Sequence, residues 1–88
     1  MPEMYIAGLQ TQLENLKEQA SKDAKMFCYL NNEKVNKLLE QAKTIKVFFK
    51  ALKVDAEQME ELNAVIKQIE DFIDFVYDTN ASRNNLID

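Results

Sequence analysis

Few residues of this sequence have side chains of the types that carry out acid–base or covalent chemistry. Histidine is absent from the 88 residues, so the commonest general base near neutral pH is missing and no Ser–His or Cys–His pair can form. The single cysteine, Cys28, stands inside an apolar run and is interpreted as a small core side chain. Paired carboxylates occur at Glu60-Glu61 and Glu70-Asp71, where the acidic, helix-forming context indicates solvated faces. These features predict a protein that is not an enzyme.

Metal and cofactor sites have equally few residues to draw on. Zinc and di-iron sites in helical proteins need clusters of His and Cys, or Glu combined with His. A phosphate-binding loop needs several glycines, and the sequence has one. We therefore expect no cofactor, no metal ligand and no catalytic residue. The net charge of −4 also argues against nucleic-acid binding, which depends on cationic neutralisation of phosphates.

Charge is distributed unevenly along the chain. Residues 31–53 carry six lysines against two glutamates, whereas residues 54–88 carry nine acidic residues against one lysine and one arginine. Within the first of these segments, residues 43–53 have the pattern of a basic amphipathic helix, which can lie on an anionic membrane or enter a groove on a partner. We favour a simpler interpretation, in which the apolar residues of this segment enter a core and its lysines stay outside.

Apolar residues recur at alternating steps of three and four along three segments, the spacing that places side chains on one stripe of an α-helix. The sequence predicts helices at roughly 3–30, 32–53 and 55–78 and no strand, because no segment alternates with period two. The predicted core positions are Ile6, Leu9, Leu13, Leu16, Ala20, Phe27 and Leu30 in the first helix, Val35, Leu38, Ala42, Ile45, Phe49 and Leu52 in the second, and Met59, Leu62, Ile66, Ile69, Ile73 and Val76 in the third.

The joint between the first two helices has two interpretations. Between Leu30 and Val35 the spacing is five, so the stripe loses register there. We favour a tight turn at Asn31 and Asn32, either of which can cap a new helix. The alternative is one long helix that runs through residues 26–35 with a local register slip.

The joint between the second and third helices is marked more clearly. Asp55 is a favourable N-cap residue, and Gln58 three residues later completes a capping box. Val54 before the cap is placed to pack against Met59, as in a hydrophobic staple. The third helix is therefore predicted to begin at Asp55.

Short connections make neighbouring helices antiparallel. The predicted fold is all-α: an antiparallel bundle of two to three long amphipathic helices, three being favoured, with coiled-coil-like packing. Residues 1–78 form the single helical domain, and the polar, aperiodic residues 79–88 are predicted to be a disordered tail. In this arrangement the lysines of the second helix would face the acidic residues of the third and select how they pair.

Several apolar residues exceed what a single stripe requires. Val65 and Phe72 widen the stripe of the third helix and suit a helix with neighbours on two sides. A small monomer would expose some of the others, and exposed apolar and aromatic residues mark interfaces. The partner-binding candidates are Met26, Tyr29, Val47, Phe48, Phe75 and Tyr77.

The leading functional prediction is a small cytoplasmic protein-binding module, acting as an adaptor, inhibitor or chaperone that covers an apolar surface of another protein. A cytoplasmic location follows from the absence of signal-peptide features at Met1-Pro2-Glu3, and no apolar run approaches the roughly 20 residues of a membrane span. One alternative is a self-assembling coiled coil, such as a homodimer. A less favoured alternative is binding to a membrane surface through residues 43–53.

Overall fold

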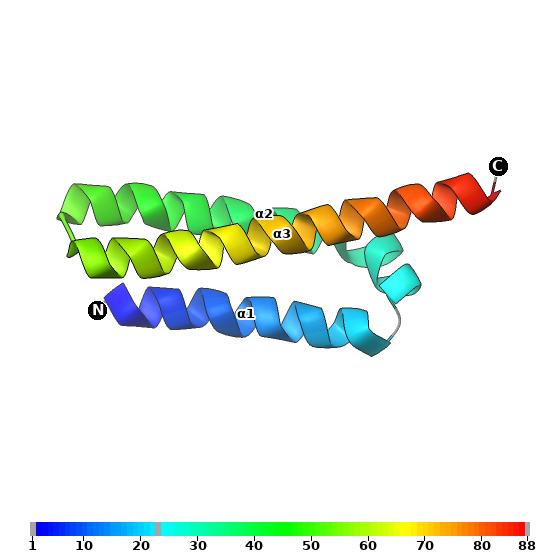
Figure 1. Ribbon diagram of the computed structural model, residues 1–88. Helices are drawn as coiled ribbons and strands as arrows, with labels where there is room; N and C mark the ends of the chain where they lie inside the picture. The colour runs from blue at the N-terminus through cyan, green and yellow to red at the C-terminus, as the bar shows by residue number, and fades with distance from the viewer. Residues whose placement is uncertain (1, 23, 88) are drawn as a thin grey trace.

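Three helices follow one another in the computed structural model, which describes the backbone of residues 2–22 and 24–87 and the side chains of residues 2–22 and 33–77. They are α1 (Pro2–Lys22), α2 (Ala24–Leu52) and α3 (Ala56–Ile87), and this part of the chain contains no strand. Figure 1 shows that α1 and α3 run in one direction and α2 in the other. The predicted three-helix antiparallel bundle is confirmed.

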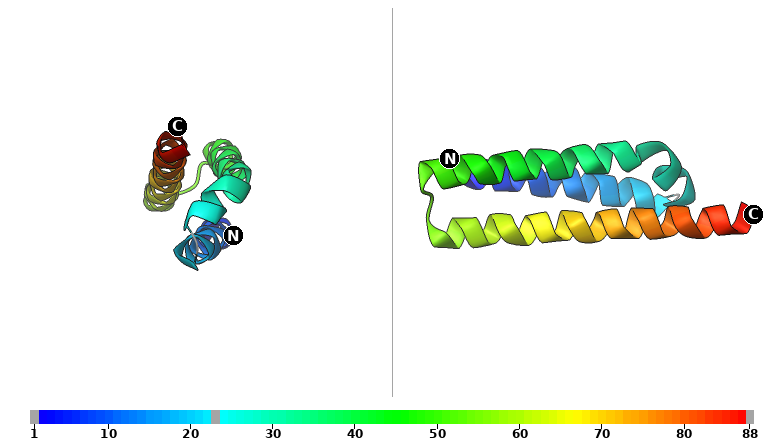
Figure 2. Two further views of the ribbon diagram at one scale, coloured as in Figure 1. Left: turned by 90° about the vertical axis from the view of Figure 1, so that its right-hand side faces the viewer. Right: turned by 90° about the horizontal axis from the view of Figure 1, so that it is seen from above.

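The bundle is elongated, with principal extents of 50 × 20 × 17 Å. Seen along its length, the three helices stand at the corners of a triangle (Figure 2, left). The contact between α2 and α3 is the most extensive, and α1 packs more on α2 than on α3. The hairpin of α2 and α3 is therefore the main body of the fold, and α1 lies against it.

The core is built from the apolar stripes that the spacing of three and four predicts. Every predicted core residue with a described side chain is buried except Ile45 and Met59, which are half-buried at its edge, and Leu52, which is exposed. Val65 and Phe72 are buried too, as expected for a helix with two neighbours. Among the described side chains no polar or charged residue is buried, so apolar packing alone stabilises the interior. Phe27 and Leu30 lie outside the described side chains.

The first joint is not where we predicted it. α2 runs without interruption from Ala24 to Leu52, so the predicted turn at Asn31 and Asn32 is wrong and the alternative of a helix through residues 26–35 is correct. The break between helices falls instead between Lys22 and Ala24. The spacing of five between Leu30 and Val35 marks a shift of the apolar stripe around a continuous helix. It does not mark the position at which the chain reverses direction.

The reversal between α2 and α3 is a Schellman turn. Val54 N–H donates to the carbonyl of Phe49 at 3.3 Å, and Lys53 N–H donates to that of Lys50 at 3.2 Å. Lys53 adopts φ 57°, the left-handed conformation in which such turns usually have glycine. Because the helix ends here, Val54 packs on the core in place of Leu52, which explains why the prediction of Leu52 as a core residue is wrong.

α3 begins one residue after the predicted N-cap, Asp55, whose carbonyl accepts the first helical hydrogen bond from Met59 N–H at 3.0 Å. The side chain of Gln58 does not fold back onto the cap. Its Nε2 donates instead to Glu3 Oε1 of α1 at 2.8 Å, so it links α1 to α3. A hydrogen bond from its own backbone N–H and the charge of the N-terminal amino group lower the pKa of Glu3, with a smaller contribution from Gln58.

α3 continues to Ile87, nine residues past its predicted end at residue 78. The side chains beyond Tyr77 lie outside the described residues, so no packing onto the bundle is assigned to them. The described core lies within residues 2–77.

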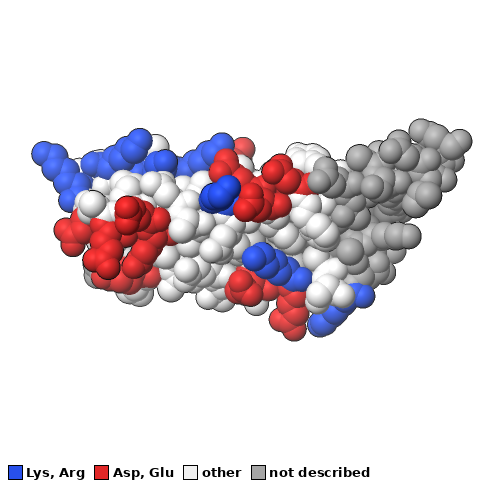
Figure 3. Space-filling view, viewed as in Figure 1, with Lys and Arg blue, Asp and Glu red and all other residues white. Residues whose placement is uncertain are grey.

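The lysines of α2 and the acidic residues of α3 occupy neighbouring surfaces, as Figure 3 shows, with lysines along the upper edge over α2 and acidic residues below them on α3. No ion pair joins the two helices within residues 33–77. The ion pairs there are Lys37–Glu33 at 3.8 Å and Lys67–Asp71 at 4.0 Å, each within one helix. If these charges select how α2 and α3 pair, as predicted, they do so without direct ion pairs between the described side chains.

Candidate protein-binding surfaces

The candidate residues with described side chains are all substantially exposed. Val47 is 68% exposed, Phe48 47%, Phe75 44% and Tyr77 50%. Met26 and Tyr29 lie outside the described side chains. The four described candidates do not form one surface, because each lies in a different structural setting.

Phe48 belongs to an apolar hollow at the end of the bundle where α1 begins and α2 ends. Tyr5 of α1 meets Phe48 edge to face, with ring centroids 6.1 Å apart, and also meets the buried ring of Phe49 at 6.2 Å. Pro2 and Leu52 complete the lining of this hollow, whose volume is about 170 Å³. Leu52, although exposed, therefore lines this hollow beside Phe48.

Phe75 lies between α3 and α1. Its ring stacks on that of Phe72, with centroids 5.9 Å apart and planes at 15°. The two rings line a shallow hollow together with Lys17, Ala20 and Ser21 of α1. Phe75 therefore extends the core toward the surface in the C-terminal half of α3. It belongs to a different hollow from Phe48.

Tyr77 and Val47 are separate again. Asn36 Nδ2 of α2 donates to the Tyr77 hydroxyl at 3.2 Å, so this tyrosine links α2 to α3. Val47 follows Lys46 on a face of α2 turned away from the core, which agrees with its large exposure. For Tyr77 a structural contact accounts for its position, whereas nothing in the described contacts explains Val47.

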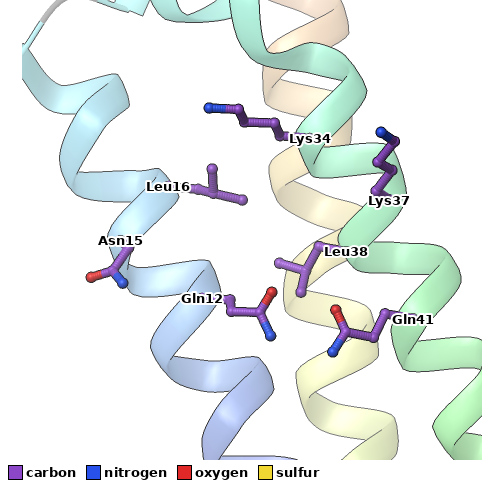
Figure 4. A pocket seen from close by; sticks show the side chains of 7 residues that line it. All are labelled: Gln12, Asn15, Leu16, Lys34, Lys37, Leu38 and Gln41. Carbon is purple, nitrogen blue, oxygen red and sulfur yellow. The ribbon is translucent and has the colours of Figure 1, made fainter.

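The groove between α1 and α2 contains a second hollow, of about 300 Å³ (Figure 4). Its floor is apolar and its sides are polar. Figure 4 shows Gln12 and Gln41 reaching toward each other from the two helices and Lys34 extending across the groove over Leu16. The lining residues are Gln12, Asn15, Leu16, Lys34, Lys37, Leu38 and Gln41.

Tyr5, Gln12 and Gln41, which line these two hollows, were not among the predicted functional residues. Tyr5 was not singled out, because it stands outside the first apolar stripe. A signal was nevertheless present. A second set of residues follows the same steps of three and four on α1, and another does so on α2, but both sets are largely polar. The two sets are Tyr5, Gly8, Gln12 and Asn15, and Lys34, Lys37, Gln41, Thr44 and Phe48.

Two further properties of the described part of the chain bear on these surfaces. It holds no group of three or more His, Cys, Asp or Glu residues placed to bind a metal ion. Within it, none of the three helices is both long enough and apolar enough to cross a membrane.

Comparison with protein-family models, with curated proteins and with solved structures finds no match to this chain.

Proposed function

We propose that the chain is a non-enzymatic protein-binding module that covers an apolar surface of a partner protein. The observation that carries this proposal is the exposure of large apolar side chains on a bundle that also has a closed apolar core. Exposed apolar residues that cluster mark interaction sites more often than single ones do. Among the described side chains, the large apolar residues that are exposed are Met4, Tyr5, Val47, Phe48, Leu52, Phe75 and Tyr77.

Clustering is strongest at the hollow of Tyr5, Phe48 and Leu52. Aromatic side chains in such positions supply much of the binding energy of protein interfaces, because they bury a large area at a small cost in conformational entropy. A small bundle also gains stability when a partner covers such a surface. A binding role therefore suits both the surface and the size of this protein.

The location of residues 43–53 favours a protein partner over a membrane surface. Phe49 is fully buried and Ile45 is half-buried against the core, so the main apolar stripe of this basic helix is already used within the bundle. A helix that lies on a membrane needs its apolar face free to enter the lipid interface.

Affinity capture from a lysate of the cells that make the protein tests the proposal. The wild-type chain is compared with Phe48→Ser, Phe75→Asp and an exposed polar control, Thr11→Ser, after circular dichroism has shown each to be helical. We expect at least one foreign protein that wild type and Thr11→Ser retain and an aromatic variant loses. Capture of the chain alone would contradict the proposal and favour self-assembly.

A further inference from the structure

The three grooves between the helices differ in the polar side-chain contacts that span them. The Gln58–Glu3 hydrogen bond spans the groove between α1 and α3, and the Asn36–Tyr77 hydrogen bond spans that between α2 and α3. Across the groove between α1 and α2, no side-chain hydrogen bond or ion pair joins the residues whose side chains are described. This groove is therefore the one that a further element can enter without breaking a polar contact.

The residues along this groove have coiled-coil spacing. On α1 the steps from Tyr5 to Asn15 are three, four and three, and on α2 the steps from Lys34 to Phe48 are three, four, three and four. Such spacing keeps a row of side chains facing a neighbouring helix over several turns. At Gly8, in the α1 row, an added Cβ would meet no atom within 4 Å, so the row leaves open space there.

The groove is polarised along its length. At one end it has the apolar hollow of Tyr5, Phe48 and Leu52, and at the other it has Lys34 and Lys37. No acidic residue lines either hollow, although the whole chain has a net charge of −4. Lys37 lies 3.8 Å from Glu33 on its own helix, whereas Lys34 makes no ion pair with any residue whose side chain is described.

We propose that this groove receives a fourth helix, an acidic amphipathic helix of a partner protein. The inference rests on the proposed function and specifies its site. The bound helix has a leucine or aromatic residue at one end, in the hollow at Phe48. Its carboxylates lie about 16–21 Å further along, the rise of 11 to 14 helical residues, where they face Lys37 and Lys34. Between them, polar side chains pair with the amides of Gln12 and Gln41, which would otherwise be buried without partners.

A synthetic helical peptide provides the probe. It has about five turns, with leucine in the first turn, serine and glutamine in the middle and two glutamates three to four turns after the leucine. A matched peptide carries lysine in place of both glutamates. Titration into the ¹⁵N-labelled chain, followed by NMR, should shift the Gly8 backbone signal and the side-chain amide signals of Gln12 and Gln41. The side-chain signals of Asn63 and Gln68 on α3 should stay in place.

Substitutions in the groove have matched controls outside it. Gly8→Leu should fill the open space and weaken binding of the acidic peptide by about tenfold or more, whereas Ala7→Leu adds the same side chain one position away and should change affinity less than about twofold. Lys34→Glu should weaken binding by about fivefold, and Lys43→Glu, the same charge change elsewhere on α2, should have a smaller effect. Binding of the acidic peptide should also weaken as salt is added.

Three results would overturn the inference: equal binding of the two peptides, unchanged affinity in Gly8→Leu, or no binding of either peptide. A dimer of the chain that Gly8→Leu dissociates would also overturn it, because the groove would then belong to a second copy. The affinity-capture experiment tests the proposed function independently of this groove. If capture depends on Phe75 and is indifferent to Gly8→Leu, the module binds a partner but through another surface.

Discussion

The ring of Tyr5 in α1 and that of Phe48 in α2 meet edge to face, at a centroid distance of 6.1 Å and an interplanar angle of 66°. Edge-to-face pairs contribute about 0.5–1.5 kcal/mol beyond the area they bury. Because both rings are close to half exposed, we expect a coupling energy near the lower end, about 0.5 kcal/mol. A double-mutant cycle with Tyr5→Leu and Phe48→Leu, followed by urea unfolding, measures it. Strictly additive effects would show that the two rings contribute independently.

Lys53 holds the left-handed position of the turn that ends α2, with φ 57°. A side chain with a Cβ costs about 1 kcal/mol in this conformation, and glycine avoids that cost. Lys53→Gly should therefore raise the free energy of unfolding by about 0.5–1 kcal/mol, after allowance for the greater freedom of glycine in the unfolded chain. Lys53→Ala removes the same charge but keeps the Cβ, so it should give no such gain. An equal gain in both variants would assign the effect to charge.

Gly8 lies inside α1, where glycine is unfavourable relative to alanine by about 0.5–1 kcal/mol. Since a Cβ at this position has no atom within 4 Å, Gly8→Ala should stabilise the chain by about that amount. The reciprocal change at the neighbouring exposed position, Ala7→Gly, should destabilise it by a similar amount. Thermal unfolding monitored by circular dichroism checks both, and a loss of stability in Gly8→Ala would contradict the open space described here.

Leu62 and Leu52 give a matched pair for the boundary of the core. Leu62 is fully buried, and Leu62→Ala should cost about 2–5 kcal/mol through lost burial and the cavity that remains. Leu52 is 56% exposed, so Leu52→Ala should cost less than about 1 kcal/mol. Urea unfolding of the two variants decides this. Comparable losses would mean that Leu52 packs on the core after all.

The lowered pKa of Glu3, whose largest cause is a hydrogen bond from its own backbone N–H, predicts a dependence of stability on pH. Folding lowers the pKa of Glu3 below its ordinary value of 4.5, so the ionised carboxylate stabilises the folded state. This contribution is fully present above the unfolded pKa and is lost as the pH falls through the lower, folded pKa. Glu3→Gln should therefore show a smaller fall in melting temperature between about pH 6 and pH 3 than wild type does. Curves that stay parallel across this range would contradict the prediction.

The core residues of this protein could be predicted from the sequence because heptad spacing is a property of residues within one helix. Leu9, Leu13 and Leu62 occupy stripe positions within single helices, and each is fully or almost fully buried. The start of α3 could be predicted for the same reason, since the preference for aspartate at an N-cap depends only on residues adjacent in the sequence. By contrast, the reversal before α2 and the exposure of Leu52 depend on where a helix stops, which stripe spacing does not encode.

The surface was less predictable, because it depends on which helices lie side by side. Phe48 was predicted to be exposed, but its edge-to-face contact with Tyr5 requires α1 to lie beside the end of α2. Tyr77 was predicted as a partner-binding residue, and its hydroxyl also accepts a hydrogen bond from Asn36, 41 residues away in the sequence, which only the packing of α2 on α3 brings close. The charge pairing expected between α2 and α3 likewise depends on how the helices pack, and the ion pairs described within residues 33–77 lie inside single helices.

An interior without polar groups leaves the alignment of the helices to the turn between α2 and α3 and to hydrogen bonds at the surface. In coiled coils, one buried polar side chain penalises a shift of one helix along another, because the shift leaves that group without its partner. Among the described side chains no such group is buried, so no buried polar contact opposes a slide here. The Schellman turn at residues 49–54 and the hydrogen bonds of Glu3 and Asn36 therefore fix the axial alignment of the helices.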